Sequence, residues 1–508
     1  MKDNPVVRFA VRHERALVIA ILLLGVSLRC AALGALPMGL NQDEASAGYD
    51  AWAILNYGVD RSGASLPVLL RSWGSGQNAL YSYLAIPGIA LLGLSELSVR
   101  LPAAVLGCLT LVLMWHFARR VRGAFEALIV LLTLAVNPWH VAISRWALES
   151  NILPFFLLLG VYFTSMTPKH PRALIGAGAA FALSLYAYGT AFFFVPLFVI
   201  CAAVWLWRRG SLSFAVFAPA ALVFLSMGTP IIACQLRNYL GYGELRLLGL
   251  TLPALTESRA LGTTILGGGS ALNNYNALWS ILLSQTDGLP FNSVPNAGLF
   301  YIWGLPVAGI GLGYALGSRR EYPLELPMVF ALAIPFAIAC ITAVNVNRIN
   351  MIFLPIVYFC GLGVAYLVKK LGSCWSAVPL IVVLASLCVL VYSYWQEYRV
   401  GAAWYFYPGL GEAIQYVEEC DPESVYITTW TEQPSIFVLF YTKPDPREYL
   451  ESVRFLNPGA AFERATTYGK YTFGNMEYAY GEFLILHRYE YGSSLPIAEF
   501  GDYGVFAG

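Results

Sequence analysis

Long apolar runs alternate with short polar or basic segments along the first 396 residues of the chain. Most of these runs have, or nearly have, the roughly 20 residues that an α-helix needs to cross a bilayer. The pattern therefore predicts an all-α polytopic membrane bundle. Twelve runs are candidate spans: 16–36, 79–94, 99–118, 123–137, 151–167, 172–189, 190–207, 212–236, 297–317, 324–344, 350–368 and 375–395.

The distribution of basic residues removes the run 79–94 from the candidate spans. This run is short and is interrupted by Pro87 and Gly88. If it stays on one side of the membrane, every basic loop falls on the same side as the N-terminus, which gives that side 15 Lys and Arg against five Asp and Glu. The positive-inside rule makes this the cytoplasmic side. We therefore expect about eleven spans, a cytoplasmic N-terminus and an extracytoplasmic C-terminus in a plasma membrane.

This threading places three irregular loops on the outer face, at 37–98, 138–150 and 237–296. The C-terminal residues 397–508 follow on the same face. There, a helix-like segment at 411–419 precedes an alternating, strand-like segment at 424–430, which is typical of an α/β domain. We predict a transmembrane module at 1–396 and a small extracytoplasmic α/β domain at 397–508.

Composition agrees with this division. The 508 residues are 58% hydrophobic and 12% charged, with a mean hydropathy of +0.62, whereas soluble domains carry about 25% charged residues. These values exclude a soluble enzyme, a disordered chain and a nucleic-acid partner. The net charge of +1 hides two opposite parts, because residues 397–508 hold 7 basic and 16 acidic residues and the rest hold 24 and 14.

The sharpest polar feature is Asp43-Glu44, just beyond the outer end of the first predicted span. Carboxylates beside hydrocarbon are costly unless they are paired, hydrogen-bonded or bound to a metal. One interpretation is a helix start, with Asn41 or Asp43 as the cap of a helix over 45–57. The other is a catalytic acid, and the two interpretations are compatible.

Two further outer segments contain candidate residues. In the loop 138–150, Glu149 lies four residues after Arg145, so the two side chains could pair on one turn of helix or Glu149 could face a cavity. Arg348 follows the tenth predicted span and has no acidic neighbour in sequence. Its guanidinium could grip a lipid phosphate or extend to the headgroups.

Other arginines raise the same question. Arg61, Arg71 and Arg100 are cations predicted on the outer face, and Arg71 and Arg100 are candidate supporting residues together with Arg145. Arg29 lies within the first span, where it needs a headgroup or an acidic partner. No Cys or His cluster, Walker loop or dinucleotide motif is present, so no motif indicates a cofactor.

Taken together, these features resemble the GT-C superfamily of integral-membrane glycosyltransferases, in particular the branch of protein O-mannosyltransferases and lipid A aminoarabinose transferases. Four segments carry the resemblance: Asp43-Glu44 after the first span, Leu97-Ser-Val-Arg-Leu-Pro-Ala-Ala-Val-Leu-Gly107 with the basic Ala118–Gly123 after it, Ser144-Arg-Trp-Ala-Leu-Glu-Ser-Asn151, and Arg348 followed by Leu354-Pro355. Residues 397–508 do not match this pattern.

The resemblance implies a donor sugar on a polyprenyl phosphate or diphosphate, used at the outer face. Asp43 would be the general base, and Glu44 would assist it or bind a metal. Glu149 would position the acceptor or hold the metal, and Arg348 would bind the donor phosphate. A divalent ion such as Mg²⁺ or Mn²⁺ is one option, with Glu44 and Glu149 as its ligands. The acceptor could be a protein, a polymer or another lipid.

The residues alone also allow a flippase or transporter of lipid-linked glycans, a glycan polymerase or ligase of similar architecture, and a scaffold whose tail is the functional part. Transporters concentrate functional charges near the midplane, often on broken helices in repeated halves. Here most charges lie at the ends of the spans and the outer loops are long and asymmetric. This favours an enzyme that works at the outer boundary. For sugar transfer from a lipid phosphate, direct in-line displacement predicts inversion at the anomeric centre.

Overall fold

The computed structural model describes residues 4–73, 75–256, 270–371, 375–460, 462–475 and 480–508. The chain forms two compact units, each assembled from three stretches of sequence. Unit 1 comprises Met1–Ala31, Ala103–Thr229 and Ala260–Tyr398, and unit 2 comprises Ala32–Pro102, Pro230–Arg259 and Arg399–Gly508. Part of the predicted outer loop 237–296, residues 257–269, lies outside the described residues.

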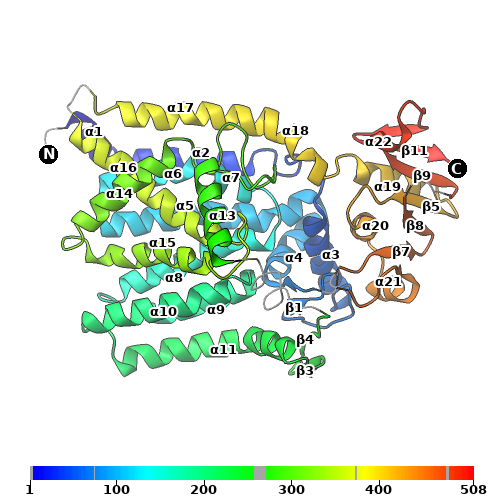
Figure 1. Cartoon of the computed structure of the whole chain (residues 1–508), viewed down its shortest axis with the longest axis horizontal. Helices are drawn as coiled ribbons and strands as arrows, with labels where there is room; N and C mark the ends of the chain where they lie inside the picture. The colour runs from blue at the N-terminus through cyan, green and yellow to red at the C-terminus, as the bar shows by residue number, and fades with distance from the viewer. Residues whose placement is uncertain (1–3, 74, 257–269, 372–374, 461, 476–479) are drawn as a thin grey trace. The chain divides into compact units, whose positions relative to one another are not determined.

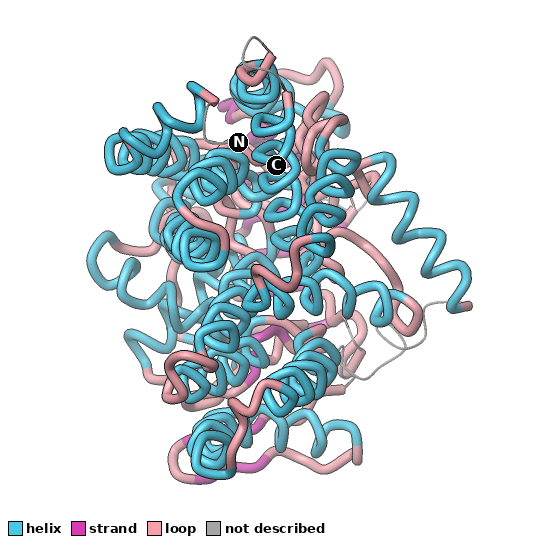
Figure 2. The backbone as a smooth tube through the Cα atoms, turned by 90° about the vertical axis from the view of Figure 1, so that its left-hand side faces the viewer, coloured by secondary structure: helices cyan, strands magenta, loops and turns pink. Residues whose placement is uncertain are grey.

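Unit 1 is a helical bundle whose long helices lie side by side (Figure 1), and several of them are seen nearly end-on in Figure 2. Helices α5 and α11 continue into unit 2. The bundle contains α1 (Pro5–Arg12), α2 (Glu14–Cys30), α5 (Glu96–Val121), α6 (Ala124–Ala135), α7 (Pro138–Ile143), α8 (Leu153–Met166), α9 (Ala173–Ala187), α10 (Ala191–Arg208), α11 (Phe214–Tyr239), α13 (Ala271–Ser284), α14 (Gly304–Gly317), α15 (Leu326–Ala339), α16 (Phe353–Lys370) and α17 (Val378–Tyr392).

The helices confirm a multi-pass membrane protein. Within the described residues, six helices are long and apolar enough to cross a bilayer, and five shorter apolar helices of 10–17 residues accompany them. One of the shorter helices is α4 (Leu80–Leu92), which contains Pro87 and corresponds to the run set aside above. The number of eleven spans and the orientation of the termini stay predictions.

The basic segments that the threading assigns to one side do lie at the same end of unit 1. The Nε atom of Arg122 donates to Oε1 of Glu325 at 2.9 Å. The other contacts at this end are Arg119 with Glu14 at 2.6 Å, Lys369 with Glu126, and Nδ2 of Asn4 with the carbonyl of Val368 at 2.8 Å. These contacts gather charge from four separate segments, as a shared membrane side requires.

Unit 2 combines the first outer loop with the C-terminal residues. Helix α3 (Gln42–Tyr57) packs against α20 (Pro434–Thr442), and the hydroxyl of Tyr49 donates to the carbonyl of Pro444 at 2.8 Å. The unit also contains α4, α18 (Arg399–Gly401), α19 (Leu410–Glu419), α21 (Pro446–Ser452), α22 (Arg488–Tyr491) and two small hairpins, β1 (Leu69–Leu70) with β2 (Gln77–Asn78) and β3 (Leu245–Leu247) with β4 (Leu250–Leu252).

A seven-stranded sheet confirms the predicted α/β character of the C-terminal residues. Its strand order is β10-β11-β9-β5-β8-β7-β6, and β5 runs parallel to β8 and β9 while the other pairs are antiparallel. The boundary between a transmembrane module at 1–396 and a C-terminal domain at 397–508 stays a prediction. The strands are β5 (Val425–Thr428), β6 (Arg454–Phe455), β7 (Ala465–Tyr468), β8 (Tyr471–Gly474), β9 (Phe483–His487), β10 (Ala498–Phe500) and β11 (Tyr503–Ala507).

Glycines let α14 and α16 approach closely inside the bundle. A Cβ atom on Gly311 of α14 would lie 1.8 Å from the carbonyl oxygen of Phe359, and one on Gly363 of α16 would lie 2.0 Å from that of Val307. Gly309 and Gly313, on the same helix α14, have no atom within 4 Å of the corresponding position. Small residues commonly allow this backbone contact between membrane helices.

We expect Gly311→Ala to destabilise unit 1 by about 1–3 kcal/mol, because the helices must move apart to admit the methyl group. Gly309→Ala and Gly313→Ala are matched controls and should be neutral or slightly stabilising, since Ala is the better helix former. Thermal unfolding of the three purified variants in detergent measures the difference. Equal melting temperatures for all three would contradict the close packing.

Candidate functional site

The start of α3 is fixed by a fully buried ion pair between Glu44 and Arg100. Nε and Nη2 of Arg100 donate to Oε1 and Oε2 of Glu44, both at 2.9 Å, in the bidentate geometry that favours such pairs. The remaining Arg100 hydrogens reach the carbonyls of Leu33, Pro37 and Gly39 at 2.6–3.2 Å. Arg100 therefore holds the segment before α3 as well as its first turn.

Glu44 also completes the helix cap. Its Oε2 accepts a hydrogen bond from the backbone N–H of Asn41 at 3.1 Å, and the Asn41 side chain caps the helix in return. The helix-start interpretation of this motif is confirmed, with Asn41 as the capping residue. Both carboxylate oxygens of Glu44 are thus engaged with protein groups, so Glu44 does not fit the role of a metal ligand.

Asp43 differs from its neighbour in its surroundings. Its side chain is partly exposed at the first turn of α3, where the helix dipole favours the ionised carboxylate. Its backbone N–H donates to Oδ1 of Asn41 at 2.9 Å. Tyr407 lies nearby: burial, and to a lesser extent the charges of Glu432 and Asp43, raise the pKa of its hydroxyl. The start of α3 therefore presents a partly exposed carboxylate near a phenol whose pKa is raised.

Sequence reasoning missed a further acidic residue on α3, Asp50. Asp50 lies seven residues after Asp43, on the same face of the helix, and its Oδ1 accepts from the backbone N–H of Arg61 at 3.1 Å. Asp60 is buried beside it, and burial raises the pKa of Asp50 to about 6 and that of Asp60 also above its usual range. Nη2 of Arg61 donates to Oγ of Ser46 at 2.7 Å. The spacing of seven residues between Asp43 and Asp50, which puts both on one face of a helix, could have revealed it.

Arg71 has a different setting from Arg61 and Arg100. It follows β1 in the loop that leads to β2, and its side chain is exposed. The structure thus brings Glu44 and Arg100 together, places Asp43 one residue away, and leaves Arg71 on the surface of unit 2.

In unit 1, Arg145 anchors the end of α2. Its Nη1 and Nη2 donate to the carbonyls of Leu28 and Ala31 at 2.9 and 2.7 Å, and the guanidinium lies over the Tyr394 and Trp395 rings. Of the two alternatives for Glu149, the structure does not show the one in which a turn of α-helix joins it to Arg145. Residues 145–148 are irregular, and a 3₁₀ helix (Glu149–Ile152) begins at Glu149.

The structure brings the segments of Glu149 and Arg348 together. Nδ2 of Asn350 donates to the carbonyl of Ser150 at 2.6 Å, so residues adjacent to the two candidates are in direct contact. Glu149 is buried and Arg348 is partly buried. The predicted outer segments that contain Glu149 and Arg348 are therefore neighbours in unit 1.

The charge of Arg348 is not balanced by a carboxylate. Its Nη1 donates to the carbonyl of Ala343 at 3.3 Å, and its backbone N–H donates to Oδ1 of Asn345 at 2.8 Å. Within the described ranges, no Asp or Glu forms an ion pair with it. A partly buried guanidinium of this kind can bind an anionic ligand.

Arg29 has neither of the partners that the sequence suggested. Its guanidinium is fully buried and donates to the carbonyls of Gly25, Leu134 and Ala135 at 2.8–3.1 Å and contacts Nδ1 of His140 at 2.7 Å. Among the described residues, backbone carbonyls and the His140 ring stand where the sequence suggested a headgroup or an acid. Arg29 thereby joins α2 to α6 and α7.

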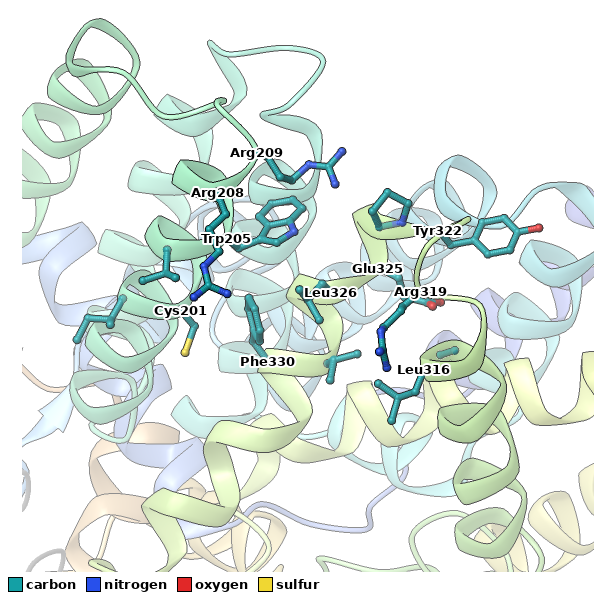
Figure 3. Close-up of a pocket in the computed structure, with 15 residues that line it drawn as sticks. Cys201, Trp205, Arg208, Arg209, Leu316, Arg319, Tyr322, Glu325, Leu326 and Phe330 are labelled. Atoms are coloured by element: carbon teal, nitrogen blue, oxygen red, sulfur yellow. The ribbon is translucent and has the colours of Figure 1, made fainter.

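A cavity of about 550 Å³ opens elsewhere in unit 1, between α10, α14 and α15 (Figure 3). Its floor is apolar and includes Trp205 and Phe330, while Arg208, Arg209 and Arg319 contribute charged groups. Glu325 also lines it but is bound to Arg122. None of the candidate site residues lines this cavity. Across the described residues, no group of three or more His, Cys, Asp or Glu could hold a metal ion.

The two adjacent acids should respond differently to substitution. We expect Glu44→Ala to cost about 3–5 kcal/mol of stability, because Arg100 would keep a buried charge without its carboxylate. Asp43→Asn should change stability by no more than about 0.5 kcal/mol, as partly exposed positions usually do. Thermal unfolding of both variants in nanodiscs provides the comparison, and equal losses would contradict the different environments.

Comparison with known proteins adds a family match and two fold matches. Residues 79–233 match the family model described as dolichyl-phosphate-mannose-protein mannosyltransferase. ArnT from Cupriavidus metallidurans bound to undecaprenyl phosphate is similar in structure, with a TM-score of 0.58 at 15% identity over 96% of this chain and 97% of that chain. No curated protein sequence matches significantly.

The oligosaccharyltransferase of Archaeoglobus fulgidus in the apo form is also similar, with a TM-score of 0.53 at 14% identity. That match covers 84% of this chain and 63% of the archaeal one. At such identities the likeness establishes the fold, and the family match over residues 79–233 agrees with it. The protein therefore has the fold of the GT-C integral-membrane glycosyltransferases, and the resemblance inferred from its sequence is confirmed.

Proposed function

We propose that this protein is a glycosyltransferase that moves a sugar from a polyprenyl-phosphate or polyprenyl-diphosphate donor to an acceptor at the outer face of the membrane. The match of residues 79–233 to the mannosyltransferase family model carries the most weight. The fold shared with ArnT, which was solved with undecaprenyl phosphate, supports a lipid-linked donor. The outer-face location depends on a cytoplasmic N-terminus, which the basic segments gathered at one end of unit 1 favour.

Asp43 is the group that we assign as general base. The acceptor oxygen forms a bond to the anomeric carbon while the bond from that carbon to the phosphate oxygen breaks, and its electron pair leaves with the phosphate. The proton of the acceptor hydroxyl passes to the Asp43 carboxylate. Direct displacement of this kind inverts the anomeric centre. The partial exposure of Asp43 and its place at a helix start support an ionised, accessible base.

Arg348 is the group that we assign to the donor phosphate. The leaving phosphate gains negative charge as its bond to the sugar breaks, and a guanidinium stabilises that charge through two parallel hydrogen bonds. The lack of a paired carboxylate at Arg348, within the described residues, supports this role.

Glu149 keeps its proposed role in acceptor positioning, since its segment contacts that of Arg348. The burial and hydrogen bonds of Arg100 and Arg145 support positioning roles for these two residues, through the start of α3 and the end of α2 respectively.

We expect Asp43→Asn to lower the rate of sugar transfer by about 10²–10⁴-fold, the contribution typical of a general base, with donor binding unchanged. Turnover of a polyprenyl-phosphate sugar by the protein in nanodiscs measures this. Asp421→Asn, a change at an exposed acid of the same unit, is the matched control. Transfer near the wild-type rate by Asp43→Asn would remove Asp43 as the base.

We expect Arg348→Ala to weaken the use of the lipid donor by about 10–100-fold in kcat/KM, because a charge-assisted hydrogen bond contributes about 1.5–3 kcal/mol. Arg15→Ala, at an exposed arginine of unit 1, should leave donor use unchanged. Steady-state kinetics with varied donor concentration tests both variants. Unaltered donor KM and kcat in Arg348→Ala would contradict the phosphate role.

A further inference from the structure

Four aromatic rings form a continuous cluster on unit 2. The Trp430 ring stacks on His487 with centroids 5.7 Å apart and an interplanar angle of 8°. Trp404 meets Trp430 edge-on at 5.5 Å, and Tyr489 lies 6.1 Å from Trp430. Trp404, Trp430 and Tyr489 are 48%, 47% and 61% exposed, whereas His487 is buried beneath them. These residues constitute the aromatic surface, and its exposed faces are not needed by the core.

Hydrogen bonds hold this aromatic surface in place. The backbone N–H of Trp430 donates to Oγ1 of Thr428 at 3.1 Å, and that hydroxyl donates to Oε1 of Glu490 at 2.7 Å. The second oxygen of Glu490 accepts from the backbone N–H of His487 at 2.9 Å. The network joins the end of β5 to the end of β9 and so fixes the backbone that carries the stacked Trp430 and His487 rings. A preorganised surface loses little entropy on binding.

The aromatic surface lies beside the start of α3. Nδ2 of Asn41 donates to the carbonyl of Tyr405, the residue after Trp404, at 2.8 Å. Nε2 of Gln42 donates to Oε2 of Glu432, two residues after Trp430, at 3.2 Å. The segments that contain the two tryptophans are therefore attached to the two residues that precede Asp43. This brings the polar groups of Gln42 and Glu432 close to the segments that carry the rings.

Exposed aromatic faces with polar groups close by suit a sugar ring. The C–H groups of a pyranose or furanose form an apolar face that packs on an aromatic ring, while its hydroxyls point sideways to polar groups. A prenyl chain would gain nothing from the amide and carboxylate groups of Gln42 and Glu432.

We propose that the aromatic surface of Trp404, Trp430, His487 and Tyr489 is the acceptor subsite, and that the acceptor is a carbohydrate. A sugar ring stacks on the exposed face of Trp404 or of Trp430, which meet edge-on, and directs a hydroxyl toward the start of α3, which carries Asp43. The assignment of this subsite to the acceptor rests on the proposed transferase function, but the binding of carbohydrate does not.

The test uses the full-length protein in lipid nanodiscs and a panel of hexose and pentose oligosaccharides, including mannohexaose and cellohexaose. Saturation-transfer NMR reports which sugar C–H groups contact the protein. We expect at least one oligosaccharide to bind and its Kd to rise about tenfold or more in Trp430→Ala and Trp404→Ala. Trp430→Phe keeps a flat ring and should restore most of the affinity. Tyr480→Ala, at a 70% exposed aromatic residue of the same unit, should have no effect.

Two comparisons separate the subsite from the chemistry. Asp43→Asn should bind the same oligosaccharide normally and transfer nothing to it, whereas Trp430→Ala should raise the acceptor KM and leave the donor KM unchanged. If Asp43→Asn retains transfer while the tryptophan variants lose binding, the proposed base fails and the subsite stands.

Three results would overturn the carbohydrate subsite. The first is that no oligosaccharide of the panel binds the wild-type protein. The second is equal affinity in wild type, Trp430→Ala and Trp404→Ala. The third is fluorescence quenching by brominated phospholipid that Trp404→Phe or Trp430→Phe reduces, since this would place the rings in the membrane interface.

Discussion

The bidentate pair between Glu44 and Arg100 is the contact on which the geometry of unit 2 depends. It removes two charges from water, which is costly unless every donor and acceptor finds a partner. Here the cost is met because Arg100 also binds three carbonyls before α3, and Glu44 also binds the Asn41 N–H. The direction of α3, and with it the position of Asp43, follows from this pair. The neighbouring carboxylates of Asp43 and Glu44 therefore differ in role, because Glu44 is buried against Arg100 and Asp43 is partly exposed.

Two buried arginines of unit 1, Arg29 and Arg145, donate to backbone carbonyls. Arg29 and Arg145 satisfy their guanidinium groups mainly with the carbonyls near the ends of α2 and α6, where helices leave acceptors unused. They are therefore structural links between segments. Arg348 has one weak carbonyl contact by comparison. This difference in hydrogen bonding supports a ligand-binding role for Arg348 more strongly than its place after the tenth predicted span does.

The sequence predicted the helices well because apolar runs and basic loops act locally and collectively. It also offered Asn41 as one of two candidate caps for the helix start, and this cap depends on residues three positions apart. It could not separate the role of Glu44 from that of Asp43, since the deciding partner, Arg100, lies 56 positions away. The helical turn from Arg145 to Glu149, one of the two alternatives for Glu149, does not form for a similar reason: tertiary contacts of Arg145 with α2 fix the conformation there.

The aromatic surface shows where such prediction ends. Trp404, Trp430 and His487 come from a connecting segment and from the ends of two parallel strands, and the sheet order β9-β5 is what makes the last two neighbours. Because these rings and Asp43 belong to one compact unit, acceptor recognition and proton removal would be set by the same scaffold. The proposed phosphate-binding residue, Arg348, belongs to the helical bundle.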